Sequence, residues 1–260
     1  MLYQSLLFVT FLLLSIYSHV GNATVNCSDF DAKAIKLITL DVFAATMDTS
    51  TSLQINIAKI LTNITPDQVK ALADSWMNAY GSYAGTTFDE SVTGPSPFQW
   101  MLTTTLQQIL KDMNIVASQT EFDALVNSWG VLIPWPATAE VLQKVAAAGI
   151  YIAPLSNGDK NTLKSAMSVF SPEVNMQFIF TSDFPVGSFK PDSQMYAQVT
   201  RVSNLSEHEF LHIAGAPTDA QGARKYGIFA GLVYNVPIPG PNRPCFAMKN
   251  ITDLVAILGL

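Results

Sequence analysis

From residue 136 to the C-terminus the chain alternates between two hydrophobic patterns, and this alternation limits the possible folds more than any other feature. Segments with apolar residues at helical spacing alternate with short apolar runs of the kind found in buried strands. We expect helices at 138–148, 160–169, 193–201, 220–226 and 251–258, and strands at 150–155, 178–180, 209–214 and 231–234. Such alternation predicts an α/β fold with a doubly wound parallel sheet, whose ligand crevice lies beyond the carboxyl ends of the strands.

The part of the chain before residue 136 adds one more strand and a helical insertion. Residues 34–40 form an apolar run that ends at Asp41, as a buried parallel strand would. Residues 52–61, 66–80, 97–113 and 118–128 have helical spacing, and helix-start signals open two of them, at Thr65-Pro66 and at Ser118. We therefore expect an α/β core from 27–50 and 133–260, with a helical cap inserted at 51–132.

The N-terminus has the pattern of a secretory signal peptide. We assign it to residues 1–22, because an apolar run from Leu6 to Ile16 is followed by small and polar residues. The run is too short to span a bilayer, but no Lys or Arg precedes it, which leaves a membrane anchor or a buried first helix as alternatives. We expect a secreted protein without stable membrane insertion. Glycosylation sequons beginning at Asn26, Asn63, Asn204 and Asn250 agree with this route.

The cysteine content also agrees with export. Cys27 and Cys245 are the only cysteines, and a Pro-rich stretch at 236–244, expected to be a surface loop, precedes the second. In an oxidising compartment an even pair predicts one disulfide that joins the two ends of the mature chain. Two unpaired buried thiols are the alternative.

Charge and motif content exclude several classes of function. Charged residues make up 13% of the chain, the net charge is −6 and no cluster of Lys and Arg occurs, so we expect a small-molecule substrate and no nucleic acid. No Gly-rich dinucleotide loop or Cys/His metal cluster is present, nor the Gly-x-Ser-x-Gly motif of serine hydrolases. The expected mature chain has only His208 and His212, and we expect His212 to be a core or edge residue of its strand.

Four polar residues follow predicted strands: Asp41, Ser156, Lys190 and Asp219. Singly, each has a simple explanation, since Ser-Asn-Gly-Asp and Lys-Pro-Asp are turn sequences and Asp219 could cap the next helix. Together they make chemical sense. A carboxylate at the mouth of a parallel sheet can act as a nucleophile, and the ammonium of Lys190 near Asp41 would favour its charged form.

The order of these motifs resembles the haloacid dehalogenase (HAD) superfamily and, within it, the type II or (S)-2-haloacid dehalogenases. The resemblance runs from about Lys36 to the C-terminus and includes Leu155-Ser-Asn-Gly158, Phe189-Lys-Pro-Asp192 and Asp219-Ala-Gln-Gly-Ala-Arg224. It implies a Rossmann-like HAD core with a cap. It further implies a hydrolase in which Asp41 forms an ester intermediate that water hydrolyses, with Lys190 and Asp219 also catalytic. The substrate-binding residues that it implies are Ser156, Asn157, Phe43 and Met77.

Departures from the family pattern keep other functions open. Phe43 stands where superfamily phosphatases usually carry a general-acid Asp, so we expect no cofactor, and Mg²⁺ only if the alternative of a HAD-type phosphohydrolase holds. Ala45 replaces the usual Thr, although Thr46 could compensate if the loop shifts. Met77 replaces an Arg that grips the substrate carboxylate in dehalogenases.

Further departures are Ala214 and Ala216, which replace a Ser and an Asn. The resulting apolar pocket would bind a haloacid poorly, and a catalytically weakened secreted binding protein is therefore a second alternative. An aromatic set in the predicted cap suggests either a larger hydrophobic substrate or, for most of its members, ordinary packing of cap on core. The set is Trp76, Tyr80, Tyr83, Phe98 and Trp100. A homodimer also remains open.

Overall fold

A five-stranded sheet forms the centre of the protein, in a computed structural model that describes residues 25–233 and 238–260. The expected signal peptide lies outside the described residues. All neighbouring strands pair in parallel, in the order β4-β1-β5-β6-β7. Their bounds are β1 (Leu37–Leu40), β4 (Tyr151–Pro154), β5 (Phe210–Ala214), β6 (Phe229–Val233) and β7 (Phe246–Met248). Every residue of β1, β5 and β6 is buried, as expected of strands covered on both faces.

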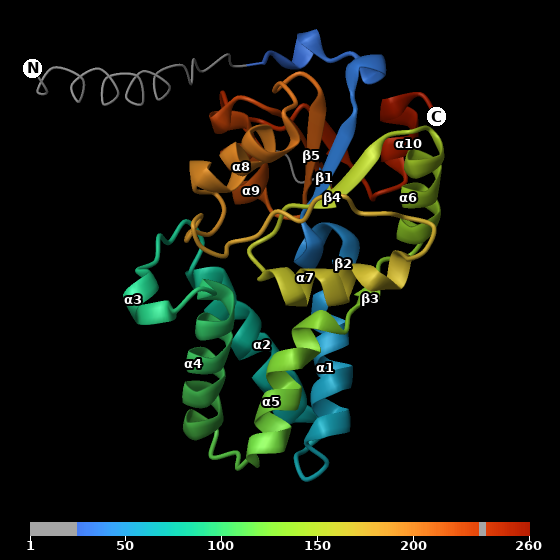
Figure 1. Ribbon diagram of the computed structural model, residues 1–260. Helices are drawn as coiled ribbons and strands as arrows, with labels where there is room; N and C mark the ends of the chain where they lie inside the picture. Colours follow the sequence, from blue (N-terminus) through green and yellow to red (C-terminus); the bar gives the residue numbers. More distant parts are fainter. Residues whose placement is uncertain (1–24, 234–237) are drawn as a thin grey trace, which may run out of the picture.

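Helices cover both faces of this sheet, which confirms the doubly wound α/β fold. Figure 1 shows α8 (Ser193–Ser203) and α9 (Pro217–Tyr226) together on one side, and α6 (Thr138–Ala147) and α10 (Asp253–Leu258) on the other. The short helix α7 (Lys160–Met167) lies between the sheet and the helices below it.

The helical insertion forms a cap below the sheet in Figure 1. It contains α1 (Thr49–Ile60), α2 (Pro66–Ser82), α3 (Glu90–Thr93), α4 (Pro97–Asp112) and α5 (Gln119–Asn127). Both predicted helix starts are present, because Thr65 with Gln68 and Ser118 with Glu121 form reciprocal capping boxes. A short antiparallel pair, β2 (Met47–Asp48) and β3 (Ile133–Pro134), joins the two connections between cap and core.

One predicted strand is absent from the sheet, and one strand of the sheet was not predicted. The segment expected as a strand at 178–180 has a single bridge, between Leu155 and Phe180, and is not a strand of the sheet. The fifth strand is instead β7, directly after Cys245. Its three residues include an exposed Ala247, so it has no continuous apolar run by which the sequence could reveal it.

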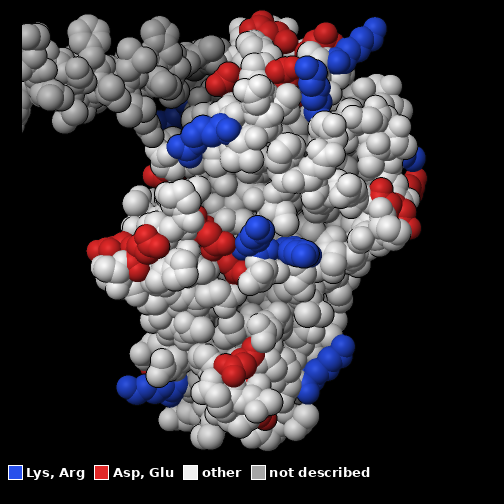
Figure 2. Space-filling view, viewed as in Figure 1, with Lys and Arg blue, Asp and Glu red and all other residues white. Residues whose placement is uncertain are grey.

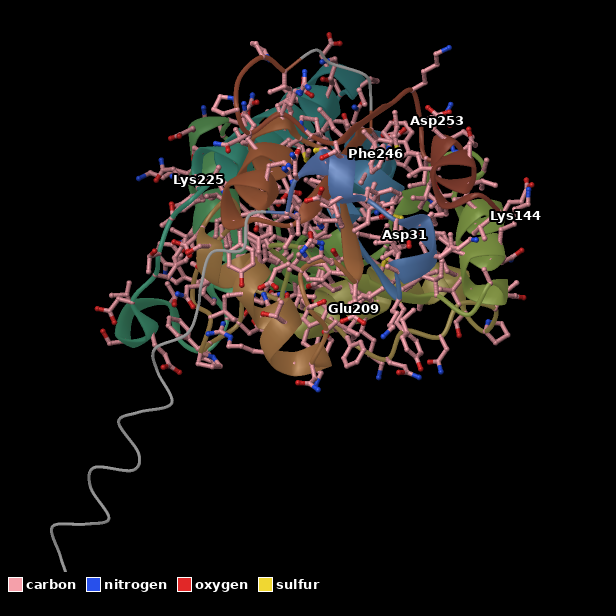
Figure 3. All side chains as sticks on the ribbon, turned by 90° about the horizontal axis from the view of Figure 1, so that it is seen from above. Asp31, Lys144, Glu209, Lys225, Phe246 and Asp253 are labelled. Atoms are coloured by element: carbon pink, nitrogen blue, oxygen red, sulfur yellow. A yellow bond between two sulfur atoms is a disulfide. The ribbon has the colours of Figure 1, made fainter. Side chains whose placement is uncertain are left out.

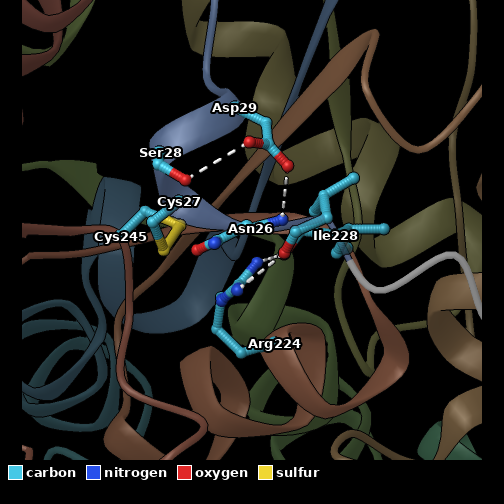
Figure 4. The surroundings of a disulfide bond; sticks show 8 residues. Asn26, Cys27, Ser28, Asp29, Arg224, Ile228 and Cys245 are labelled. Carbon is cyan, nitrogen blue, oxygen red and sulfur yellow. Dashed lines mark hydrogen bonds between the residues drawn. A yellow bond between two sulfur atoms is a disulfide. The ribbon is translucent and has the colours of Figure 1, made fainter.

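The predicted disulfide between Cys27 and Cys245 is present, with the two Cα atoms 5.2 Å apart. It fastens the short helix at Cys27–Asp29 to the residue before β7 (Figure 4). Beside it, the guanidinium of Arg224 donates to the carbonyl oxygens of Ile228 and Val25 at 2.7 and 2.9 Å. The N-terminal end of the described chain is thus held to the core by one covalent link and by backbone contacts.

Charges are scattered over the surface. The face in Figure 2 is largely uncharged, with Lys and Arg side chains standing singly or in small groups. Figure 3 shows Lys144 and Lys225 at opposite edges of the core, and Lys144 pairs with Glu140 on its own helix. No helix within the described residues combines the length and apolar character that a bilayer span requires.

Candidate active site

Asp41 lies at the carboxyl end of β1, an inner strand of the sheet, where four donors contact its carboxylate. The chain turns there into a short π-helical segment, Val42–Thr46, and Oδ2 of Asp41 accepts hydrogen bonds from the amides of Ala44 and Ala45 at 3.1 and 3.3 Å. Its Oδ1 accepts from Oγ of Ser156 at 3.3 Å and from Nζ of Lys190 at 2.9 Å. The side chain is buried but borders a cavity.

Lys190 joins two carboxylates. Besides Asp41, its Nζ donates to Oδ2 of Asp219 at 2.7 Å and to the carbonyl oxygen of Leu155 at 3.0 Å. An ammonium has three donors, so these three acceptors use all of them. Burial alone would lower the pKa of Lys190, but the charges of Asp219 and Asp41 outweigh burial and raise it. Lys190 is therefore held as a cation.

Two further side chains, those of Tyr196 and His212, contact the carboxylate of Asp219. The hydroxyl of Tyr196 donates to its Oδ1 at 2.9 Å, and Nε2 of His212 lies 3.0 Å from the same oxygen. Burial raises the pKa of Asp219, but His212 and Lys190 more than reverse this, so that the pKa is well below its ordinary value. The N-cap of α9 is Ala216, so Asp219 does not have the capping role that its position allowed.

His212 extends this network into the sheet. Its Nδ1 lies 3.0 Å from the hydroxyl of Thr39, on the neighbouring strand. Polar contacts thus run from Thr39 through His212, Asp219 and Lys190 to Asp41. Sequence reasoning expected His212 to be a core or edge residue of its strand but missed its contact with Asp219, and it did not identify Tyr196. The available signal was an imidazole in an otherwise apolar buried strand, since a buried polar group needs a partner.

The cavity that Asp41 borders is small, with a volume of about 170 Å³. Asp41, Lys190 and Asp219 border it from the core, and Met77 and Tyr80 border it from cap helix α2. Asn157 connects the two sides: its Oδ1 accepts from the Lys190 amide at 2.8 Å, and its Nδ2 donates to the Tyr80 hydroxyl at 3.2 Å. The predicted site residues are thereby brought to one place.

Two side chains have contacts that differ from those expected. Ser156 is fully buried and is not among the residues that border the cavity, and its hydroxyl donates to Oδ1 of Asp41. The hydroxyl of Thr46 donates to the carbonyl oxygen of Val42 at 2.9 Å. It therefore does not replace the hydroxyl that is missing at Ala45.

The aromatic residues of the cap chiefly pack. Trp76 and Phe98 are fully buried, and the ring of Phe98 stacks on Phe43 with centroids 5.2 Å apart. Trp129 meets Phe43 edge-on at 5.4 Å. Of the five rings considered from sequence, only Tyr80 borders the cavity, which does not support a pocket for a large hydrophobic substrate.

This fold and site define a HAD-type hydrolase, and a family comparison agrees. The family model described as haloacid dehalogenase-like hydrolase matches residues 72–233, and the chain belongs to that family. Within the described residues, no group of three or more His, Cys, Asp or Glu side chains is arranged to hold a metal ion.

Individual relatives point in the same direction. An (S)-2-haloacid dehalogenase of Pseudomonas putida is 24% identical over 166 residues, which cover 62% of this chain and 71% of that protein. Another, of Burkholderia cepacia, is 27% identical over 105 residues, covering 40% of this chain and 45% of that protein.

Solved structures of dehalogenases share the fold. A defluorinating L-2-haloacid dehalogenase superposes with a TM-score of 0.72 at 23% identity, over 87% of this chain and 96% of that one. The L-2-haloacid dehalogenase of Xanthobacter autotrophicus, with chloropropionic acid covalently bound, gives 0.71 at 16% identity, over 86% and 98%. At these identities the likeness concerns the fold alone.

Proposed function

We propose that this protein is a hydrolytic dehalogenase that acts through covalent catalysis by Asp41. The observation that carries the proposal is the position of Nζ of Lys190, within 2.9 Å of Asp41 and 2.7 Å of Asp219 beside the cavity. This arrangement holds and orients the carboxyl group of a potential nucleophile at a site that a small molecule can enter. The names of the relatives support the same reaction type.

The proposed reaction has two steps. A carboxylate oxygen of Asp41 attacks the carbon that bears the halogen, an ester bond forms, and the halide leaves with the bonding electrons. A water molecule that Asp219 orients then attacks the ester carbonyl of Asp41, and an alcohol is released. The net reaction consumes one water and yields alcohol, halide and a proton, and it restores the carboxylate.

Phe43 favours a halide over an alkoxide as the leaving group. It lies two residues after Asp41 and stacks on Phe98, so this position offers no proton to a departing alcohol. A halide needs none. A HAD-type phosphohydrolase, which would use Mg²⁺, is for this reason the weaker proposal.

A second candidate function is binding without turnover. It is favoured by the apolar side chains at Met77 and Ala216, which border the cavity where the resemblance implies polar groups. The intact contacts of Asp41 with Lys190 and of Lys190 with Asp219 favour the enzyme instead.

Isotope labelling separates these candidates. The purified protein would turn over a panel of organohalides and phosphate esters in heavy-oxygen water, with and without Mg²⁺, and the peptide that contains Asp41 would be weighed. We expect heavy oxygen in that peptide together with halide release, and neither with Asp41→Asn. A folded protein that gains no label and releases neither halide nor phosphate would favour the binding protein.

We also propose that the protein is secreted and N-glycosylated. Supporting features are the disulfide and the exposure of Asn26, Asn63, Asn204 and Asn250. Expression of the full chain through a eukaryotic secretory pathway should yield protein in the medium that loses mass on enzymatic deglycosylation. Retention in the cell, or an unchanged mass after deglycosylation, would contradict the proposal.

A further inference from the structure

The charged residues that border the cavity are two carboxylates and one ammonium, so they carry one more negative charge than positive. Among the described residues that border it, Lys190 is the only cation, whereas Asp41 and Asp219 both carry carboxylates. These three groups sum to one net negative charge. A substrate therefore enters a site that has no uncompensated positive charge to offer it.

Lys190 also has no donor left for a substrate. Its three hydrogens are directed to Asp41, Asp219 and the carbonyl oxygen of Leu155. For Lys190 to bind an anionic substrate, one of these contacts would have to break, and a buried carboxylate or carbonyl would lose its partner. Such a loss is costly for a buried charged or polar group.

The cap side of the cavity is uncharged. Met77, Ala84 and the Tyr80 hydroxyl border it there. Burial, followed by the charge of Asp41, raises the pKa of Tyr80 well above its ordinary value, so this hydroxyl stays neutral. The hydroxyl oxygen of Tyr80 accepts a hydrogen bond from Asn157. The hydroxyl proton of Tyr80 is therefore available for donation to a neutral acceptor, such as an amide or ester carbonyl.

From these contacts we propose that the site selects small uncharged organohalides, such as 2-haloamides, over 2-haloacid anions. An anion would meet the excess negative charge beside Asp41, in a protein whose overall charge is −6. A neutral substrate avoids that repulsion and can place its apolar part against Met77 and Ala216. The cavity of about 170 Å³ is of a size that suits a small substrate of this kind. This inference rests on the proposed dehalogenase function and adds the substrate class.

A matched pair of substrates tests the proposal. 2-Chloropropionamide and 2-chloropropionate share the carbon that reacts and the halide that leaves, and differ chiefly in charge. We expect wild-type kcat/KM for halide release to be at least about tenfold higher with the amide. Met77→Arg, which adds a cation at the cap side of the cavity, should raise kcat/KM for the carboxylate and reverse the preference.

Asn78→Arg is the control for charge, because Asn78 is exposed on the same helix and does not border the cavity. It should leave the preference unchanged. Equal rates, or a wild-type preference for 2-chloropropionate, would overturn the neutral-substrate proposal while supporting dehalogenation. No halide release from either compound, by the folded wild-type or Met77→Arg protein, would overturn dehalogenation itself and with it this inference.

Discussion

His212 Nε2 lies 3.0 Å from Oδ1 of Asp219, and His212 is not among the residues that border the cavity. The imidazole is fully buried in β5, and its other nitrogen lies 3.0 Å from Oγ1 of Thr39. It therefore links the strand that ends at Asp41 with the carboxylate that holds Lys190. The sheet itself, and not only the loops at its edge, contributes to the position of the charged groups.

Removing this link should destabilise the protein. In His212→Leu, Thr39 and Asp219 each lose the hydrogen bond that they make with the imidazole. We therefore expect the free energy of unfolding to fall by about 1–3 kcal/mol. His212→Gln, which keeps an amide donor, should lose less. Urea unfolding would measure both, with His208→Leu as the control because His208 is exposed. Equal losses in His212→Leu and His208→Leu would contradict the role assigned to the contact.

Lys190 should matter far more to stability than an exposed lysine does. Lys190→Met leaves Asp41 and Asp219 buried without their cation, and we expect a loss of about 3–5 kcal/mol along with loss of halide release. Lys144→Met breaks an exposed pair with Glu140 and should cost less than about 1 kcal/mol. Thermal and urea unfolding of the two variants would check this. A comparable loss of stability in both would show that the buried ion pairs of Lys190 contribute no more to the free energy of unfolding than the exposed pair does.

Acid should weaken the fold through Asp219. Its pKa is lowered in the folded protein, relative to an ordinary value of 3.8 that applies when the chain is unfolded. The stabilisation is therefore fully present above about pH 4 and is lost as the pH falls towards the folded-state pKa. We expect the free energy of unfolding to decrease with falling pH in that range.

The Asp219→Asn variant should show a smaller decrease, because the residue no longer titrates. Asp67→Asn, at an exposed carboxylate, is the matched control and should keep the wild-type slope. Urea unfolding at a series of pH values below 5 would decide. A wild-type slope in Asp219→Asn would assign the acid sensitivity to other groups.

The disulfide should contribute measurably to stability, since it closes a loop across 218 positions of sequence. The double substitution Cys27→Ser and Cys245→Ser should lower the free energy of unfolding by about 2–4 kcal/mol. A reducing agent should have a similar effect on the wild type and none on the double variant. If reduction left the wild-type midpoint unchanged, the link would contribute nothing under those conditions.

Several parts of the fold and site could be predicted from sequence because they depend on local patterns. The capping signals at Thr65 and Ser118 mark the starts of α2 and α5, since side chain and backbone of the same few residues satisfy each other. Asp41, Ser156 and Asp219 could be placed near one another because parallel strands share one edge at their carboxyl ends.

Other features could not be predicted because they depend on which segments meet. The strand β7 lacks a continuous apolar run and is defined by its pairing with β6. Phe178 and Phe180 have the composition of a strand, yet only Phe180 makes a bridge, to Leu155. Strand propensity describes how a residue fits a half-buried surface, and that surface exists only after the chain has folded.

The sequence by itself determined the α/β class, the helical insertion, the chemical groups of the site and the cysteines available for pairing, because each follows from residue type and spacing. Only the tertiary structure decided how those groups are used. Whether Lys190 has a donor to spare, whether Thr46 reaches the cavity, and whether His212 supports Asp219 depend on distances between side chains from different elements. Hydrogen bonds and charge balance act over a few ångströms, and no pattern along the chain specifies such distances.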